Sequence, residues 1–377
     1  MTDRPVLVLN AGSSSLKYRV LRPGSGERLL SGHLERLHHD DFADALVRLV
    51  ADLEAAGMGA DTLAGVGHRV VHGGSRFVAP TLVDDGVLAG LEGLVPLAPL
   101  HNPPAIRGIR HAREAYPDLP QVAVFDTAFF ADLPPEAATY ALDREVMERH
   151  EIRRYGAHGI SHRYVAGQVA AFLGRPLADL DQIVLHLGNG ASAAAIRGGR
   201  PVETSMGLTP LEGLVMGPRG GDLDPGVLLH LLRVGGLDVA ELDDLLHHRA
   251  GLRGLCGLQD FRDIQAAVDA GDRAAATAYA VYCHRLRKYV GAYLAVLGGA
   301  DVVTFTAGAG EHVPRLRADV TSGLEPLGIH LDPLLNASAD PSAPVRISAE
   351  DSAVTVLVVP TDEELSIARQ VVQVLEA

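Results

Sequence analysis

The stretch that decides the fold of this chain is Asn10-Ala11-Gly12-Ser13-Ser14-Ser15-Leu16-Lys17. It follows an apolar run at 6–9 that is typical of a buried strand, and it leads into residues 16–21, which alternate like a half-buried strand. A strand, a short turn of glycine and serines, and a second strand make a hairpin. Its tip offers backbone N–H groups, hydroxyls, an amide and an ammonium without any acidic group, and a phosphate chain needs such donors.

An ordinary polar turn fits this stretch as well as a phosphate site does. A Walker A loop is excluded, because the Gly-x4-Gly-Lys-Ser/Thr spacing is absent. A dinucleotide-binding fingerprint is excluded too, since the glycines are missing and a strand follows instead of a helix. Residues 183–197 repeat the same order of apolar strand, glycine-rich turn and second strand. The repeat indicates an internal duplication, with one phosphate-binding turn in each half.

Length and composition narrow the class of protein. A chain of 377 residues can form two domains, each with its own core, and 47% hydrophobic with 21% charged residues is typical of a soluble globular protein. The net charge of −14 argues against nucleic-acid and anionic-membrane surfaces. Cys256 and Cys283 show neither metal-ligand spacing nor a disulfide framework, and no apolar run approaches the roughly 18 residues of a membrane span. We expect a cytoplasmic protein.

Several charged residues lie where strands are predicted to end. Arg69 stands among apolar neighbours in the predicted strand 66–72, either as half of an ion pair or as an anion receptor. His68 and His72 share one face of that strand, but no third zinc ligand is near. Asp126 ends the apolar strand 122–125, a position where α/β folds place catalytic or metal-binding acids; helix capping is the alternative.

The second half contributes three further features. A glycine-punctuated loop at 206–225 carries Arg219, and loops of that length inside a domain are usually functional or disordered. The predicted strand 301–306 runs into a glycine turn and a helix start, which can seat a nucleotide. Residues 361–364 have the spacing of a capping box, which leaves Glu363 free for another role. The longest predicted helix covers residues 273–297.

Together these motifs resemble the acetate kinase family, in the superfamily that also contains sugar kinases, actin and heat-shock chaperones. The resemblance covers nearly the whole chain and implies an α/β fold of two duplicated actin-like (ribonuclease H-like) domains with a catalytic cleft between them. It places one domain at 1–130 plus 364–377 and the other at 131–363, with a homodimer formed mainly through the second. The motifs are Asn10 to Lys17, His68 to Gly74, Leu97 to Pro104, Phe125 to Phe129, His186 to Gly190, Thr209 to Pro225, Phe305 to Gly308 and Pro360 to Leu365.

The resemblance implies a reversible, Mg²⁺-dependent transfer of a phosphoryl group from ATP to acetate, with acetyl phosphate and ADP as products and Mn²⁺ as a substitute metal. Because two anions must meet, catalysis would be mostly positioning and charge neutralisation. The implied catalytic residues are Asp126, His158 and Arg219, the last two as transition-state stabilisers.

Binding roles follow from the same resemblance. Arg69, Val71, Leu100 and Pro210 would bind the carboxylate substrate, and Asn10 and Glu363 would bind the metal. His101 would line the same cleft. The implied ATP-binding residues are Ser13, Ser15, Lys17, His186, Leu187, Gly188, Asn189, Gly190, Asp260, Phe261, Arg262, Gly308, Ala309, Gly310 and Glu311.

Some positions depart from the family pattern. Ala157 replaces a usual phenylalanine, Phe130 a usual histidine and His312 a commoner asparagine, and the neighbours of Arg219 also differ. The change at Ala157 keeps open a propionate or other short-chain acyl kinase with an enlarged acyl pocket. A non-enzymatic alternative is an actin-like ATP switch, which needs no carboxylate receptor. An NAD-dependent oxidoreductase would need the strand–GxGxxG–helix unit, which is absent.

Overall fold

The structure is a computed structural model that describes residues 4–12, 15–35 and 41–377. The chain divides into two compact units, of which unit 1 comprises Met1–Ala131, Ala157–Tyr164 and Asp362–Ala377, and unit 2 comprises Asp132–Gly156 and Val165–Thr361. This division differs from the predicted boundaries, because it assigns Ala131, residues 157–164, Asp362 and Glu363 to unit 1. The physical reason is packing and charge: Ile160 belongs to a core cluster with Leu365, and Asp362 pairs with arginines of unit 1.

Unit 1 is built on a six-stranded mixed sheet. Its strands lie in the order β3 (Arg28–Glu35), β2 (Ser15–Leu21), β1 (Val6–Ala11), β4 (Gly65–Val70), β6 (Gln121–Phe125) and β5 (Thr81–Leu82). β1 to β3 form an antiparallel meander, β1, β4 and β6 are parallel, and β5 is antiparallel to β6. Its helices are α1 (Asp41–Ala55), α2 (Asp85–Gly93), α3 (Asn102–Ala115) and α15 (Glu363–Glu376), with short 3-10 turns η1 (Val95–Leu97) and η2 (Ala128–Phe130).

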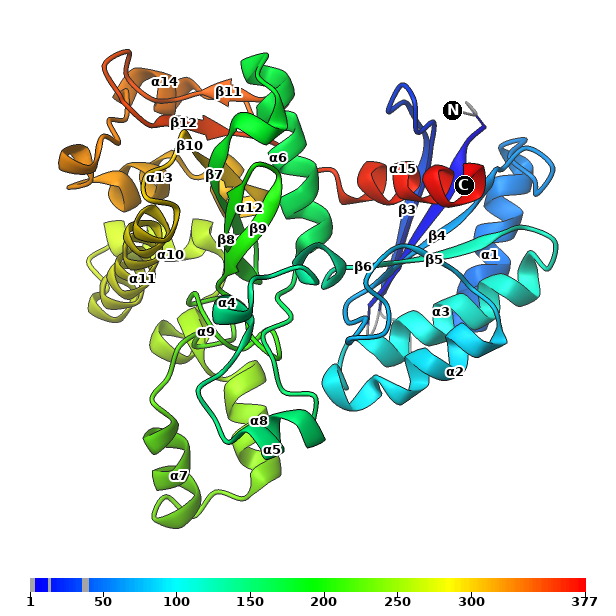
Figure 1. The fold of residues 1–377 in the computed structure, drawn as a ribbon, viewed down its shortest axis with the longest axis horizontal. Coiled ribbons are helices and arrows are strands. Elements are labelled where there is room, and N and C mark those ends of the chain that lie inside the picture. The colour runs from blue at the N-terminus through cyan, green and yellow to red at the C-terminus, as the bar shows by residue number, and fades with distance from the viewer. Residues whose placement is uncertain (1–3, 13–14, 36–40) are drawn as a thin grey trace. The chain divides into compact units, whose positions relative to one another are not determined.

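The apolar run in β1 is uninterrupted because both of its faces are buried. Leu7 and Leu9 pack in a cluster with residues of α1 and α3, whereas Val6 and Val8 pack in another with residues of α15. Side chains alternate between the two faces of a strand, so a strand covered on both sides must be apolar at every position. In Figure 1, α15 is the red helix beside the blue strands of the same unit.

The predicted opening hairpin is confirmed. β1 pairs with β2 in an antiparallel register that sets Asn10 opposite Lys17 and Ala11 opposite Leu16. Ser13 and Ser14 of its turn lie outside the described residues.

Unit 2 repeats this arrangement, and the predicted duplication is therefore confirmed. Its sheet has the order β11 (Val345–Arg346), β12 (Thr355–Val358), β10 (Val302–Thr306), β7 (Asp181–Leu187), β8 (Ala191–Arg197) and β9 (Arg200–Thr204). β7 to β9 form an antiparallel meander, and β7, β10 and β12 are parallel. These strands match β1 to β3, β4 and β6 of unit 1 in order and direction.

The longest helix of unit 2, α11 (Arg273–Leu297), has the predicted bounds. The Asp272 side chain caps its first N–H groups, and Gly298 ends it in the left-handed conformation, with φ of 74°. The remaining helices are α4 (Pro135–Ala138), α5 (Arg144–Arg149), α6 (Gly159–Leu173), whose first residues belong to unit 1, η3 (Leu177–Asp179), α7 (Pro225–Arg233), α8 (Val239–His248), α9 (Gly251–Cys256), α10 (Phe261–Asp269), α12 (Ala307–His312), α13 (Pro314–Thr321), η4 (Glu325–Leu327) and α14 (Pro333–Ser338).

The predicted capping box at the start of α15 is wrong. The N-cap is Asp362, whose side chain accepts a hydrogen bond from the Leu365 N–H at 3.0 Å. Glu364 instead lies 3.2 Å from the Arg19 guanidinium, because β2 brings that arginine to the start of α15. No helix in the described part of the chain is long and apolar enough to cross a membrane.

Candidate active site

Arg69, Asp126 and Glu363 form a charged cluster in unit 1. Arg69 lies near the end of β4, Asp126 directly follows the neighbouring strand β6, and Glu363 is the first residue of α15. Arg69 donates to Asp126 Oδ2 from Nε at 3.1 Å and from Nη2 at 2.9 Å, and its Nη1 lies 3.1 Å from Glu363 Oε2. The ion-pair interpretation of Arg69 is therefore confirmed, and its role as an anion receptor stays a prediction.

The cluster carries one guanidinium for two carboxylates. Asp126 is only 1% exposed, and its Oδ1 accepts no hydrogen bond from the residues that the structure describes. Burial raises the pKa of Asp126 to about 6, with Arg69 acting in the opposite direction and Glu363 adding to the rise. Burial also acts to lower the pKa of Arg69, but the two carboxylates outweigh it and raise that pKa. The cluster therefore favours a further cation near Asp126.

The oxygen donors near this cluster fit the expected Mg²⁺ ion. Leu9 in β1 pairs with His68 in β4, so Asn10 lies level with Arg69 on the adjacent strand. An amide oxygen, the Glu363 carboxylate and the unpartnered Asp126 Oδ1 are the hard ligands that Mg²⁺ prefers. Within the described ranges, no three His, Cys, Asp or Glu side chains are grouped to hold a metal, so an ion here would keep several waters.

His158 is held beside Asp126 by a strained backbone. Its φ is +57°, in the left-handed region that a non-glycine residue rarely adopts. The next residue, Gly159, donates its N–H to the Asp126 carbonyl oxygen at 2.9 Å, and a Cβ there would lie 2.3 Å from that oxygen. Only glycine allows this approach, and strain of this kind gathers at functional sites.

Sequence reasoning missed a buried clamp beside the predicted carboxylate site. Asn102, at the start of α3, accepts a hydrogen bond from the His72 N–H at 3.1 Å and donates to the His72 carbonyl oxygen at 3.0 Å. It fixes the end of β4, next to Val71, against α3. Val71 and His101 are half-buried and Leu100 is 40% exposed. The only sequence signal for the clamp was the place of Asn102 in the motif from Leu97 to Pro104.

The other predicted unit 1 residues lie on the opening hairpin. Ser15 is half-buried at the start of β2. Lys17, two residues further along the same strand, is exposed. Ser13 lies outside the described residues.

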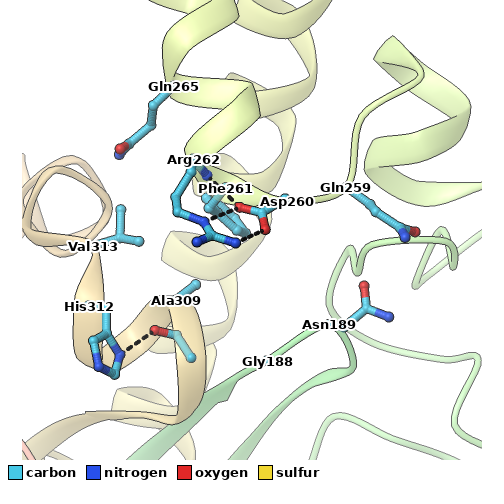
Figure 2. Close-up of a pocket in the computed structure, with 11 residues that line it drawn as sticks. Gly188, Asn189, Gln259, Asp260, Phe261, Arg262, Gln265, Ala309, His312 and Val313 are labelled. Carbon is cyan, nitrogen blue, oxygen red and sulfur yellow. Dashed lines mark hydrogen bonds and ion pairs between the residues drawn. The ribbon is translucent and has the colours of Figure 1, made fainter. Parts of the chain in front are cut away.

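Unit 2 contains a cavity of about 590 Å³, within the size range of small-ligand sites. In the view of Figure 2, Asn189 and Gln259 lie on one side of it and His312 and Val313 on the other. Of the residues predicted to bind ATP, the ones that line it are Gly188, Asn189, Asp260, Phe261, Arg262, Gly308 and Ala309. Sequence reasoning did not name Gln259, Gln265 and Val313, which also line it. His312, where the family more often has asparagine, lines it too.

An exposed ion pair lies between the two sides of this cavity. Arg262 donates to both oxygens of Asp260, from Nε at 3.0 Å and from Nη2 at 2.6 Å. The hydrogen bond from Arg262 lowers the pKa of Asp260 to about 2. Behind the pair, Phe261 packs edge-on against Tyr282, with ring centroids 4.9 Å apart. Both charges are therefore paired, which leaves the cavity with apolar walls and amide groups suited to a nucleoside.

Some predicted nucleotide residues do not line the cavity. Leu187 is fully buried and His186 is 7% exposed, both in β7. Gly190, Gly310 and Glu311 are close in sequence to lining residues but are not among them.

The loop that carries Arg219 is attached to the cavity turn. The Gly217 N–H donates to the Asn189 carbonyl oxygen at 3.0 Å, and a Cβ at Gly217 would lie 2.0 Å from the Asn189 amide oxygen. Arg219 donates from Nη1 to the Pro210 carbonyl oxygen at 2.7 Å, and no described carboxylate lies within ion-pair distance of it. Burial lowers the pKa of Arg219 to about 10, so it stays charged at neutral pH. Among the residues that the structure describes, Arg219 therefore has no carboxylate counter-ion.

A sequence model of the acetokinase family matches residues 34–369, which is most of the chain. This chain belongs to the acetokinase family.

Solved structures of acetokinases agree with this assignment. The chain is 38% identical to the acetate kinase of Porphyromonas gingivalis, with a TM-score of 0.92 over 98% of this chain and 99% of that one. It is 36% identical to a propionate kinase from Francisella tularensis, with a TM-score of 0.90 over 97% and 98%. For the acetate kinase of Entamoeba histolytica the identity is 30% and the TM-score 0.86, over 96% and 97%. The predicted actin-like α/β fold is confirmed.

Membership of the acetokinase family makes this protein an ATP-using kinase of small carboxylates. The predicted catalytic and binding residues fall in both units. Asn10, Ser15, Lys17, Arg69, Val71, Leu100, Asp126, His158 and Glu363 belong to unit 1. His186, Leu187, Gly188, Asn189, Gly190, Pro210, Arg219, Asp260, Phe261, Arg262, Gly308, Ala309, Gly310 and Glu311 belong to unit 2.

Proposed function

We propose that this protein catalyses reversible transfer of the γ-phosphoryl group of ATP to acetate, giving acetyl phosphate and ADP. The observation that carries the proposal is the buried Asp126, with one oxygen held by Arg69 and the other without a described partner. Such a carboxylate can hold a cation beside an arginine. Together the two positive groups offset the repulsion between the anions that must react.

The proposed transfer gives a separate role to each of the cationic residues. A carboxylate oxygen of acetate attacks the γ-phosphorus, an oxygen–phosphorus bond forms, and the bond to the leaving ADP oxygen breaks and leaves its electron pair on ADP. Arg69 binds the attacking carboxylate, Arg219 binds the transferring group, and His158 donates to its equatorial oxygens. No proton transfer is needed to activate the nucleophile, because acetate is already ionised at neutral pH.

The metal and the nucleotide have separate places in the proposal. Asn10 and Glu363 would hold Mg²⁺, or Mn²⁺ in its place, which when bound neutralises phosphate charge and orients the phosphate chain. The adenosine would occupy the cavity of unit 2, between Asn189 and His312. Ser13, Ser15, Lys17 and Gly190 would contact phosphates.

A second candidate substrate is propionate or another short-chain acid. The observation that favours it is Ala157, a small residue that is only 3% exposed where the family usually has phenylalanine. The similarity to the Francisella tularensis propionate kinase points the same way.

The test is ATP formation from ADP and acyl phosphates, with and without Mg²⁺. The ATP is detected by coupling its formation to the phosphorylation of glucose. We expect acetyl phosphate and propionyl phosphate to support it, and Arg219→Ala to lower kcat by roughly 10²–10⁵. Arg200→Ala, an exposed arginine in β9 of the same unit, is the matched control. ATP hydrolysis without any ATP formation from acyl phosphates would favour the actin-like switch instead.

We also propose that the protein forms a homodimer through unit 2. Large apolar side chains are exposed there on and between α7 and α8, including Val234 at 72% and Val239 at 75%. A second copy of the chain would remove this surface from water. Light scattering after gel filtration should give twice the chain mass for the wild type, and Val234→Glu with Val239→Glu should shift it toward one chain.

A further inference from the structure

The carbonyl oxygen of Pro210 directs the Arg219 side chain. Arg219 Nη1 donates to it at 2.7 Å, and this is the one hydrogen bond that the guanidinium makes to residues that the structure describes. An arginine side chain has several rotatable bonds, so a hydrogen bond at its tip decides where the charge lies. Whatever holds Pro210 in place therefore helps to hold Arg219.

The hydroxyl of Tyr140 closes the turn that contains Pro210. It accepts a hydrogen bond from the Leu208 N–H at 3.0 Å and donates to the Glu212 carboxylate. Leu208 stands two residues before Pro210 and Glu212 two residues after it, so one oxygen atom holds both arms of the turn. The approach is close enough that a Cβ at Gly207 would overlap the Tyr140 hydroxyl and the Glu212 carboxylate.

Arg154 ties this closed turn to the sheet of unit 2. Its Nη2 donates to Glu212 Oε1 at 2.8 Å, and its Nη1 donates at 3.2 Å to the carbonyl oxygen of Thr204, the last residue of β9. The Arg154 guanidinium also lies over the Tyr140 ring, 5.4 Å from its centroid. All of these residues belong to unit 2, as Pro210 and Arg219 do. The whole arrangement therefore lies within one compact unit.

The Tyr140 hydroxyl acts on the loop and has no proton to offer a substrate. Burial and the neighbouring Glu212 carboxylate raise the pKa of Tyr140, so the phenol stays protonated and its proton stays on the hydrogen bond to Glu212. Tyr140 lines a separate cavity of about 340 Å³, and neither Pro210 nor Arg219 is among the residues that line that cavity. Any effect of the hydroxyl on the reaction must pass through the turn.

We propose that Tyr140 is a positioning residue for Arg219 and acts through the turn at Pro210. By holding both arms of the turn, it keeps the Pro210 carbonyl oxygen where Arg219 donates to it, so the guanidinium is in place before the phosphoryl group arrives. Charge that is already oriented stabilises a transition state better than charge that must be oriented during the reaction. The inference rests on the proposed function, since that function assigns the transferring group to Arg219.

The test is a double-mutant cycle of Tyr140→Phe and Arg219→Ala, measured as ATP formation from ADP and acetyl phosphate. Tyr140→Phe removes one oxygen and keeps the ring, and we expect kcat to fall about tenfold to a hundredfold, the usual loss for a displaced catalytic group. The KM for ADP should change less than about twofold, because Tyr140 does not line the nucleotide cavity. In the Arg219→Ala background, Tyr140→Phe should lower kcat less than about twofold, since no guanidinium is left to position.

The control variant is Tyr279→Phe, which removes another hydroxyl of unit 2 that donates to a carboxylate, that of Asp319 at 2.7 Å. It should keep kcat within about twofold of the wild type, in either background. If Tyr140→Phe lowers kcat by the same factor with and without Arg219, Tyr140 acts independently of that arginine and the proposal is wrong. A folded Tyr140→Phe enzyme with wild-type kcat would overturn it as well.

A second variant covers the case in which Tyr140→Phe does not fold. Glu212→Ala opens the same turn from its other arm, so its effect on kcat should also disappear in the Arg219→Ala background. An equal effect of Glu212→Ala in both backgrounds would overturn the proposal. Failure of the proposed function is distinct, because the wild type would then form no ATP from acetyl phosphate.

Discussion

Arg69 donates both Nε and Nη2 to a single oxygen of Asp126, at 3.1 and 2.9 Å, and turns Nη1 to Glu363 at 3.1 Å. The guanidinium is thus shared between two carboxylates from different segments, Asp126 directly after β6 and Glu363 at the start of α15. A planar group with several donors in a fixed fork can do this, whereas an ammonium cannot reach both partners with the same geometry.

This sharing predicts the behaviour of Arg69 variants. Arg69→Ala should lower kcat by roughly 10²–10⁵, because it removes positive charge from the reacting anions. It should also destabilise unit 1, since two carboxylates would stay close together without their cation. Arg69→Lys should restore stability more than activity. Steady-state kinetics and urea unfolding of both variants check this, and a lysine variant with wild-type kcat would contradict it.

Glu363 should affect metal use far more than stability. Glu363→Ala leaves Arg69 paired with Asp126 alone, and the N-cap of α15 is Asp362, so the helix keeps its cap. We expect the Mg²⁺ concentration for half-maximal activity to rise about tenfold or more, with little change in Tm. The measurement is a Mg²⁺ titration at saturating ADP and acetyl phosphate, with Asp362→Ala as the capping control. A collapse of Tm in Glu363→Ala with an unchanged titration would make Glu363 structural.

Ala157 should widen the choice of acid. Replacing an aromatic ring by a methyl group takes several heavy atoms from the proposed pocket wall, and each extra buried methylene contributes roughly 0.8 kcal/mol. Enzymes discriminate by about 1–3 kcal/mol per methylene. We therefore expect the ratio of kcat/KM for propionate or butyrate to that for acetate to be about tenfold or more higher in this protein than in a relative with phenylalanine at this position.

The check is kcat/KM for the three acids on wild type, Ala157→Phe and Ala157→Val. Ala157→Phe should restore the preference for acetate. Ala157→Val tests the same wall with less risk of overpacking, because Ala157 is buried. The same steep preference for acetate in all three enzymes would mean that neighbouring side chains already fill the space.

His68 should make unit 1 less stable in mild acid. Its Nε2–H donates to the Gln121 amide oxygen at 2.7 Å inside the core, and burial lowers its pKa to about 4. The folded pKa is below the unfolded value of about 6.5, so the stabilisation is complete above pH 6.5 and is lost as the pH falls toward 4. At pH 5 the loss should be about 2 kcal/mol.

Urea unfolding at pH 7.5 and pH 5 measures this effect. His68→Gln cannot titrate in this range, so its free energy of unfolding should fall about 2 kcal/mol less than that of the wild type over the same interval. Equal losses in the two proteins would show that other groups cause the acid sensitivity.

The amino-acid sequence by itself determined the elements and their duplication. The apolar runs of β1 and β7, each followed by a glycine-rich turn and a second strand, are local patterns, and backbone geometry converts them into hairpins without reference to the rest of the chain. The bounds of α11 could be predicted for the same reason, since Asp272 and Gly298 mark its ends. The sequence also predicted candidate site residues at the ends of strands, because parallel strands end at a common edge of the sheet.

Only the tertiary structure decided which of these residues meet. That Arg69 is divided between Asp126 and Glu363, that Asn102 clamps His72, and that Glu311 turns to Thr361 depend on the path of the chain between them. The N-cap of α15 is Asp362, and the predicted capping box at 361–364 does not form, because β2 places Arg19 where it binds Glu364. Such contacts join residues far apart in sequence, and no local periodicity or spacing records the distance between their side chains.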